Sequence, residues 1–142
     1  MEKQERDGRT VVGAARPEES LRILVAEDSP VNQKIMALFL ERDGHRVSLV
    51  DNGAAAVAAL EREQFDLVLM DVQMPVMDGF EATRAIRSLE GGTGERLPII
   101  ALTAHAVEGD RERCLAAGMD DYLSKPFQIG TFREMISRFL AG

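Results

Sequence analysis

With 142 residues, 45% of them apolar and 29% charged, the chain suits one compact domain that needs no metal or disulfide to hold its core. Its net charge of -7 argues against direct binding to nucleic acid, which requires a basic face. No apolar run approaches the roughly 20 residues of a membrane span and the first residues are too charged for a secretory signal, so we expect a cytoplasmic protein without a membrane span.

Residues 1–20 are mostly polar, and their short apolar patch cannot pack a core. We therefore predict a flexible leader or linker there, followed by a folded domain over residues 21–142. Within that domain, short apolar runs recur and are typical of strands. These runs lie at Ile23–Ala26, Val47–Val50, Leu67–Met70, Ile99–Leu102 and, more weakly, Tyr122–Leu123.

Stretches with helical spacing separate these runs. In the first stretch, Ser29 is a candidate N-cap, Pro30 occupies the first helical position and Gly44 is the expected stop. The apolar stripe that we expect this helix to turn toward a sheet consists of Val31, Ile35, Leu38 and Phe39.

Four more helices are predicted along the chain. They cover Ala54–Gln64, Phe80–Glu90, Val107–Ala117 and a last segment whose stripe is Ile129, Phe132, Ile136 and Phe139. The third of these is the weakest, since Gly109 within it costs about 1 kcal/mol relative to alanine. It contains the single cysteine, Cys114, which has no disulfide partner in the chain and is most simply a reduced core residue.

Strand and helix thus alternate five times, and this alternation decides the fold class. Parallel strands need crossover helices, and helices need a sheet face on which to bury their apolar stripes. We therefore predict an α/β fold, with a doubly wound parallel sheet that is covered by helices on both faces.

Polar side chains follow four of the five predicted strands, at the end of each apolar run. They are Glu27 and Asp28, Asp71, Thr103, and Lys125. In a parallel sheet these positions share the carboxyl edge, where open α/β sheets place their sites. Any one of them is commonly an ordinary surface charge, but their joint occurrence favours a site with several carboxylates, one hydroxyl and one ammonium group.

Clustered carboxylates repel, so they either bind protons or hold a cation. Mg²⁺ suits a small carboxylate site with open positions for water and phosphate oxygens, whereas no His or Cys is placed for zinc. Phosphoryl transfer fits this set of groups. Asp71 would attack as the nucleophile, while Lys125 and the metal neutralise phosphate oxygens and Thr103 donates a hydrogen bond.

The residues also carry a resemblance to a known family. The chain resembles the receiver domains of two-component response regulators, and the similarity extends from Leu21 to about Leu140. The segments that carry it are "ILVAEDSPVNQ", "DLVLMDVQMPVMDGFEA", "PIIALTA" and "DDYLSKPF". The resemblance implies a flavodoxin-like sheet with the strand order 2-1-3-4-5.

The resemblance also implies roles for individual residues. Asp71 would be the phosphoacceptor and a ligand of Mg²⁺, for which Mn²⁺ is a possible substitute. Asp28 would bind the metal directly, Glu27 would act through water, and Gln73 would contribute its backbone carbonyl.

Conformational switching is implied for the region from Thr103 to Tyr122. Thr103 and Lys125 match the phosphate-sensing hydroxyl and the lysine of the family, and Tyr122 matches its aromatic switch, although plain core packing would also explain a tyrosine there. Gln73 and His105 would tune the lifetime of the phosphoryl group, and an exposed loop histidine is an equally good interpretation of His105. A cis bond is implied before Pro126, and the read-out surface would be formed by the fourth helix, fifth strand and fifth helix.

Expected partners follow from "SPVNQKIM" and "ALTAHAVEGDRERCLAAGMDDYLSKPF", which look like receivers of hybrid sensor histidine kinases. They are a sensor histidine kinase, a histidine phosphotransfer protein, or both. The chain could be a single-domain regulator or a domain excised from a hybrid kinase, and a monomer or weak homodimer is expected. Since one helix remains after Phe127, no DNA-binding or catalytic effector is expected within it.

Three other functions compete with this interpretation. Phosphatases of the haloacid dehalogenase type also phosphorylate a strand-end aspartate, but they carry a second acid two residues later, where this chain has Gln73. We therefore expect no enzyme, and at most a slow autophosphatase. A flavin- or nucleotide-binding module would need a glycine fingerprint or phosphate loop that the sequence lacks. A degenerate receiver is disfavoured because every acidic, hydroxyl and lysine position is filled.

Overall fold

The computed structural model describes residues 20–91, 96–103, 110–125 and 128–141. In this part of the chain five strands alternate with five helices. The strands are β1 (Arg22–Ala26), β2 (Arg46–Val50), β3 (Leu67–Asp71), β4 (Ile99–Thr103) and β5 (Asp121–Ser124). The helices are α1 (Pro30–Arg42), α2 (Gly53–Arg62), α3 (Gly79–Glu90), α4 (Asp110–Ala117) and α5 (Ile129–Ala141). The expected leader lies outside the described residues, except for Ser20.

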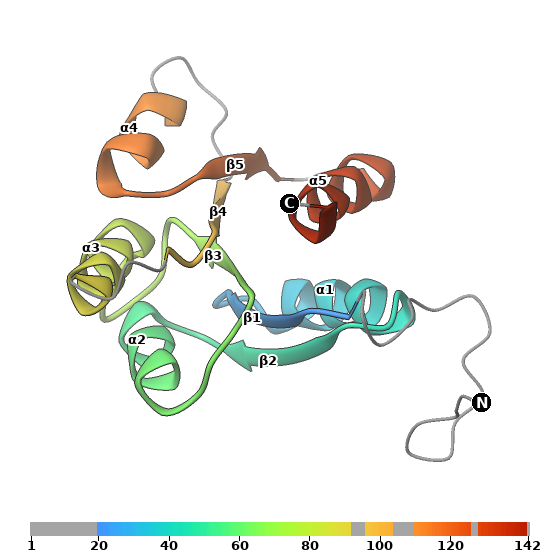
Figure 1. Cartoon of the computed structure of the whole chain (residues 1–142), viewed down its shortest axis with the longest axis horizontal. Coiled ribbons are helices and arrows are strands. Elements are labelled where there is room, and N and C mark those ends of the chain that lie inside the picture. The colour runs from blue at the N-terminus through green and yellow to red at the C-terminus, as the bar shows by residue number, and fades with distance from the viewer. Residues whose placement is uncertain (1–19, 92–95, 104–109, 126–127, 142) are drawn as a thin grey trace.

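All strand pairs are parallel, and the order in the sheet is β2-β1-β3-β4-β5. The doubly wound α/β fold and its strand order are therefore confirmed. Helices α1 and α5 cover one face of the sheet, while α2, α3 and α4 cover the other (Figure 1). Because every strand runs in the same direction, the loops that follow the strands gather at one edge.

The apolar core lies in two layers, one on each face of the sheet. The first layer joins β-strand residues such as Val25 and Leu69 to Met36 of α1 and to Phe132 and Ile136 of α5. The second consists of Leu24, Ala26, Ala56, Ala59, Val68, Met70, Ala82, Ile86, Ile99, Ala101, Cys114 and Met119. Strand β3 is buried along its whole length because it lies in the middle of the sheet. Cys114 is buried and forms no disulfide, as predicted.

Helix α1 begins where its capping residues predict. The Ser29 side chain accepts a hydrogen bond from the Asn32 backbone N–H, and Pro30 is the first helical residue. The helix ends at Arg42, shortly before Gly44, which has a φ of 94°. Since glycine adopts this left-handed conformation without strain, it allows the chain to turn into β2.

The predicted buried stripe of α1 is wrong for three of its four residues, and only Phe39 packs against the core. Val31, Ile35 and Leu38 are 65%, 43% and 55% exposed, whereas Met36 and Leu40 are only 2% and 1% exposed. The helix carries apolar residues on two sides, so its spacing alone does not determine which side faces the sheet. Tertiary packing of Met36 and Leu40 decides the rotation, and it leaves Val31, Ile35 and Leu38 on the outer surface.

Helix α3 is fastened to the turn that leads into β5. The Arg87 guanidinium donates to the carbonyls of Leu97 and Gly118, both at 2.8 Å, and to the Asp120 carboxylate at 2.9 Å. The Asp120 carboxylate also accepts the backbone N–H of Ile99 at 2.8 Å. These bonds fix the starts of β4 and β5 relative to α3.

The last two helices agree with prediction where they are described. Phe132 and Ile136 of α5 are buried, as the stripe predicts. The side chains of Ile129 and Phe139 lie outside the description, as do residues 107–109 of the predicted fourth helix. Among the described residues, no helix is both long and apolar enough to span a membrane.

Candidate functional site

Asp71 is the last residue of β3, and its residue surface is only 4% exposed. Four apolar residues precede it, and all of them are fully buried. The strand therefore holds the Asp71 backbone rigidly at the carboxyl edge of the sheet. The strand is one residue longer than the predicted apolar run Leu67–Met70, because it includes Asp71 itself.

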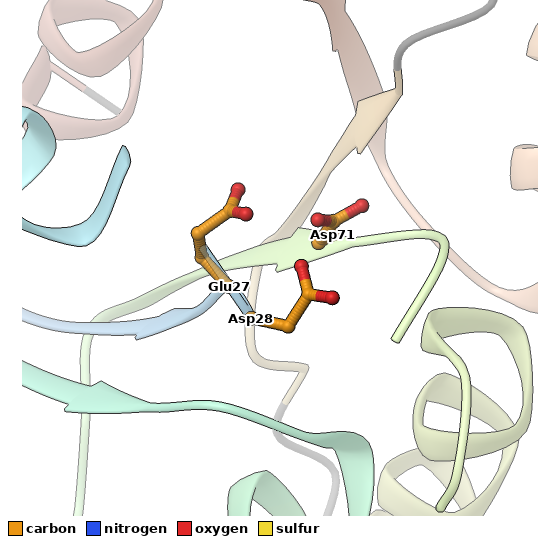
Figure 2. A group of neighbouring side chains, drawn as sticks. All are labelled: Glu27, Asp28 and Asp71. Atoms are coloured by element: carbon orange, nitrogen blue, oxygen red, sulfur yellow. The ribbon is translucent and has the colours of Figure 1, made fainter. Parts of the chain in front are cut away.

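Glu27 and Asp28 follow β1 and meet Asp71 at this edge. One carboxylate oxygen from each of the three side chains lies within 4.8 Å of the others. Figure 2 shows the three side chains gathered at the adjacent ends of β1 and β3. Glu27 is 1% exposed, while Asp28 is exposed to solvent. Three carboxylate oxygens at this spacing, one of them open to water, fit the oxygen ligands that Mg²⁺ prefers.

Lys125 brings a positive charge to the same cluster. Its Nζ donates to Glu27 Oε1 at 3.0 Å and to Asp71 Oδ2 at 3.1 Å. Its backbone N–H donates to the Thr103 carbonyl at 2.7 Å, just beyond the pairing of β5 with β4. Because Lys125 directly follows β5, its ammonium group lies between the carboxylates of Glu27, after β1, and Asp71, at the end of β3.

The charges of the cluster shift one another's protonation. Burial and the charge of Glu27 raise the pKa of Asp71 to about 6, although Lys125 opposes the shift. Burial alone would raise the pKa of Glu27, but hydrogen bonds from Lys125 and the Ser29 N–H outweigh it and lower that pKa. Burial would lower the pKa of Lys125, but its bonds to Glu27 and Asp71 outweigh burial and raise it. One ammonium group therefore faces an excess of negative charge, which favours a bound cation.

The loop after β3 shapes the approach to Asp71. The backbone N–H of Gln73 donates to Asp71 Oδ1 at 3.0 Å. The loop closes where the Gly79 N–H donates to the Val72 carbonyl at 2.9 Å, and a Cβ at Gly79 would collide with the Asp71 carbonyl. A capping box between Asp78 and Glu81 then starts α3.

Other predicted site residues lie nearby or outside the description. Thr103 ends β4 and is 7% exposed, so it reaches the same edge as Asp71. Tyr122 is half-buried in β5 and packs against the core layer of α2, α3 and α4. Gln73 is exposed. His105 and the bond before Pro126 lie outside the described residues.

Two contacts with Glu27 were not predicted from the sequence. The Ser29 backbone N–H donates to Glu27 Oε2 at 3.1 Å, and the Gln33 side chain donates to the Glu27 carbonyl at 2.7 Å. The available signal was the position of a long amide side chain in the first turn of the helix that follows the acidic pair. The amide's contacts cannot be predicted from that position alone, because they depend on which side of α1 faces the sheet.

The family model of the response regulator receiver domain matches residues 23–137. The sensor histidine kinase GacS of Pseudomonas protegens is 49% identical over 131 residues, which cover 88% of this chain and 14% of that protein. Hybrid signal transduction histidine kinase G of Dictyostelium discoideum is 45% identical over 123 residues, 85% of this chain and 4% of that protein. The chain thus spans a small part of the curated relatives that it matches.

Solved structures agree with these similarities. One of them is the receiver domain of a sensor histidine kinase from Pseudomonas aeruginosa, which has a magnesium ion coordinated in its active site cleft. Its sequence is 48% identical to this chain and the TM-score is 0.78. The match covers 87% of this chain and 99% of that one. Another match comes from a co-crystal structure of the histidine phosphotransfer protein Ypd1 and the receiver domain of Ssk1 from Saccharomyces cerevisiae. The sequence identity is 31% and the TM-score is 0.79, and the match covers 86% of this chain and 90% of that one.

The site geometry and these similarities lead to one family. The carboxylate cluster and Lys125 lie together at the carboxyl edge of the sheet, and the relatives include the receivers of hybrid sensor histidine kinases. The chain belongs to the response regulator receiver domain family.

Proposed function

We propose that this chain accepts a phosphoryl group from a phosphohistidine on the carboxylate of Asp71. A bond forms between an Asp71 carboxylate oxygen and phosphorus as the bond from phosphorus to the imidazole nitrogen breaks, and that nitrogen keeps the electron pair. The observation that carries this proposal is the contact of the buried Asp71 carboxylate with Lys125 Nζ, at 3.1 Å, beside two further carboxylates.

Mg²⁺ is the cofactor that the donor set suits, and Mn²⁺ would substitute for it. Asp28, Asp71 and the backbone carbonyl of Gln73 would bind the ion directly, and Glu27 would act through water. When bound, the ion supplies positive charge to the phosphoryl oxygens. The magnesium in the Pseudomonas aeruginosa receiver supports this choice, as does the spacing of the three carboxylates in this chain.

A change of conformation at Thr103 and Tyr122 would transmit the signal. A phosphoryl group brings up to about two negative charges to Asp71, and the Thr103 hydroxyl would move toward it. In support, Thr103 ends the neighbouring strand, and Tyr122 lies half-buried on the next strand along. Gln73 and His105 would set the lifetime of the phosphoryl group, with at most slow autophosphatase activity.

The partner would be a sensor histidine kinase or a histidine phosphotransfer protein. The co-crystal structure of Ypd1 with a related receiver domain supports this class of partner. The exposed stripe of Val31, Ile35 and Leu38 would be its docking surface, because α1 starts two residues after Asp28 and a partner bound there could reach Asp71. We propose that the receiver occupies residues 21–142 of a cytoplasmic protein, as a monomer or weak homodimer.

Mass spectrometry of the intact protein tests the central step. Incubation with Mg²⁺ and a small acyl phosphate or phosphoramidate should add the mass of one phosphoryl group to the wild-type chain. Asp71→Asn, or chelation of the metal, should abolish the gain. Asp51→Asn is the matched control, since Asp51 is an exposed carboxylate that follows β2 at the same edge, and this variant should react normally. A gain that survives in Asp71→Asn would refute the proposal.

A further inference from the structure

The side chain of Gln33 joins α1 to the ends of two strands. Its Nε2 donates to the Glu27 carbonyl at 2.7 Å and to the Val50 carbonyl at 3.2 Å. Val50 is the last residue of β2 and Glu27 follows the last residue of β1. Gln33 therefore extends the β1–β2 pairing past the end of the strands, at the carboxyl edge of the sheet.

These bonds hold Glu27 through its main chain as well as its side chain. The Glu27 N–H donates to the Val50 carbonyl at 3.0 Å, and the Gln33 amide donates to the Glu27 carbonyl. The two carboxylate oxygens of Glu27 accept from the Ser29 N–H at 3.1 Å and from Lys125 Nζ at 3.0 Å. The contacts with Val50, Ser29 and Lys125 do not involve the Glu27 carbonyl. Gln33 is therefore the residue that fixes the orientation of this carbonyl.

The direction of that carbonyl matters most for Asp28. The Glu27 carbonyl belongs to the peptide group that connects Glu27 to Asp28, so its orientation determines where the Asp28 side chain points. Within the described residues, the exposed Asp28 carboxylate accepts no hydrogen bond that would restrain it. Its position beside Asp71 therefore depends on the main chain that carries it.

We propose that Gln33 is a positioning residue for the acidic pair. Its amide orients the Glu27–Asp28 peptide, so that both carboxylates stay within 4.8 Å of Asp71 in a geometry ready for a divalent cation. This inference rests on the proposed function of the same site. Groups that orient metal ligands from outside the ligand set commonly change metal affinity by tenfold or more when they are removed.

A purely structural role would have a different effect. If Gln33 only fastened α1 to the sheet, its loss would lower the free energy of unfolding, and the cation would bind the folded protein with normal affinity. If Gln33 positions Asp28, the affinity of the folded protein itself falls. Metal affinity and unfolding temperature, measured on the same variants, therefore separate the two roles.

Gln33→Met is the decisive variant, because methionine has a similar length and volume but no N–H groups. Gln64→Met is the matched control, since Gln64 is exposed just after α2, outside the site. Calorimetric titration of each unphosphorylated protein with Mg²⁺ should show a Kd about tenfold weaker for Gln33→Met and unchanged for Gln64→Met. Thermal unfolding without metal gives the stability of each variant.

Phosphorylation by a small phosphodonor completes the design. With saturating Mg²⁺, Gln33→Met should recover most of the wild-type rate, because excess cation compensates for weaker binding. If Gln33→Met does not fold, Gln33→Asn takes its place, since its amide is one methylene too short to reach both carbonyls, and the same loss of affinity is expected.

The outcomes distinguish the inference from the function on which it rests. A Kd within twofold of wild type in the folded variant overturns the positioning role, whatever the unfolding temperature. A wild-type chain that binds Mg²⁺ but gains no phosphoryl group overturns the proposed function, while a weaker Kd in Gln33→Met would still support positioning. A wild-type chain that does not bind Mg²⁺ overturns both.

Discussion

Val76 lies in the loop between β3 and α3 with a φ of 71°, which a β-branched side chain rarely adopts. The Met77 N–H donates to the Pro75 carbonyl at 2.7 Å, so Val76 is the centre of a tight three-residue turn. The side chain is 84% exposed, and burial does not offset the strain. The turn instead presents the Met77 carbonyl to the Gly53 N–H at 2.9 Å, which ties the loop to α2.

Val76→Gly should therefore raise the free energy of unfolding. Relief of the left-handed backbone strain is worth about 1–2 kcal/mol, and the extra freedom of glycine in the unfolded chain removes about 0.5–1 kcal/mol of that gain. We expect a net stabilisation of about 0.5–1 kcal/mol, measured by urea unfolding. The matched control is Val31→Gly in the first turn of α1, where a loss of a few tenths of a kcal/mol is expected. Equal losses in the two variants would contradict the strain at Val76.

The sequence was sufficient to predict the positions of some site residues but not the contacts of others. Asp71 and Lys125 were predicted because each follows an apolar run, and parallel strands bring such positions to one edge. The contacts of Gln33 and the turn at Val76 could not be predicted in this way. They depend on the rotation of a helix and on the path of a loop, and neither is encoded in apolar spacing.

Helix α1 shows the same limit for a whole element. Its start at Ser29 and Pro30 was predicted correctly, because capping is a local property of the chain. The side that faces the sheet was predicted wrongly, because two apolar stripes compete and the choice depends on packing with β1 and α5. The stripe that lost this competition, Val31 to Leu38, is the surface proposed above for a phosphohistidine partner.

Ile35→Asp tests that surface. A charge in the middle of the exposed stripe should disrupt apolar contacts with a partner and slow phosphotransfer from a phosphorylated histidine phosphotransfer protein by about tenfold or more. Phosphorylation by a small donor should be unchanged, because Ile35 is 43% exposed and belongs to neither core layer.

Leu89→Asp is the control for Ile35→Asp. Leu89 is 48% exposed on α3, on the opposite face of the sheet, and its replacement should leave both reactions at wild-type rates. Equal phosphotransfer rates in the two variants would place the docking surface elsewhere. A loss of reaction with the small donor in Ile35→Asp would instead indicate damage to the fold.

At the scale of the whole molecule, the alternation of strands and helices was sufficient to predict a parallel sheet with two covered faces. The strand order was not contained in that alternation, since several orders satisfy it, and it followed from the family resemblance. Element boundaries moved by one or two residues where polar residues such as Arg22 and Asp71 take part in strand pairing. Pairing depends on neighbours in space, so apolar runs underestimate strand length.

The start of the domain is joined to the rest of the sheet through a buried histidine. His45 is 6% exposed, and its Nδ1 accepts the Leu21 N–H at 3.1 Å, just before β1. The Ser20 hydroxyl adds a bond to the Gly44 carbonyl at 2.7 Å. Protonation of Nδ1 would remove the acceptor, so the junction between β1 and the turn before β2 requires neutral imidazole.

The stability of the whole domain should therefore depend on pH through His45. Burial lowers the pKa of His45 below its ordinary value of 6.5, although the charge of Asp43 opposes the shift. Between the folded pKa and 6.5, the unfolded chain binds more protons than the folded one, so the free energy of unfolding falls as pH falls through this window. Above that window the contribution of His45 is fully present.

His45→Asn isolates this contribution, because the asparagine Oδ1 can accept the Leu21 N–H and does not titrate. Urea unfolding at several values from about pH 7.5 to about pH 5 should show the wild type losing stability relative to His45→Asn as the pH falls. Asp71 titrates in both proteins, so its effect cancels in the difference between them. Parallel stability curves would mean that His45 binds protons equally in the folded and unfolded states, so that burial does not lower its pKa and the junction at Leu21 does not sense pH.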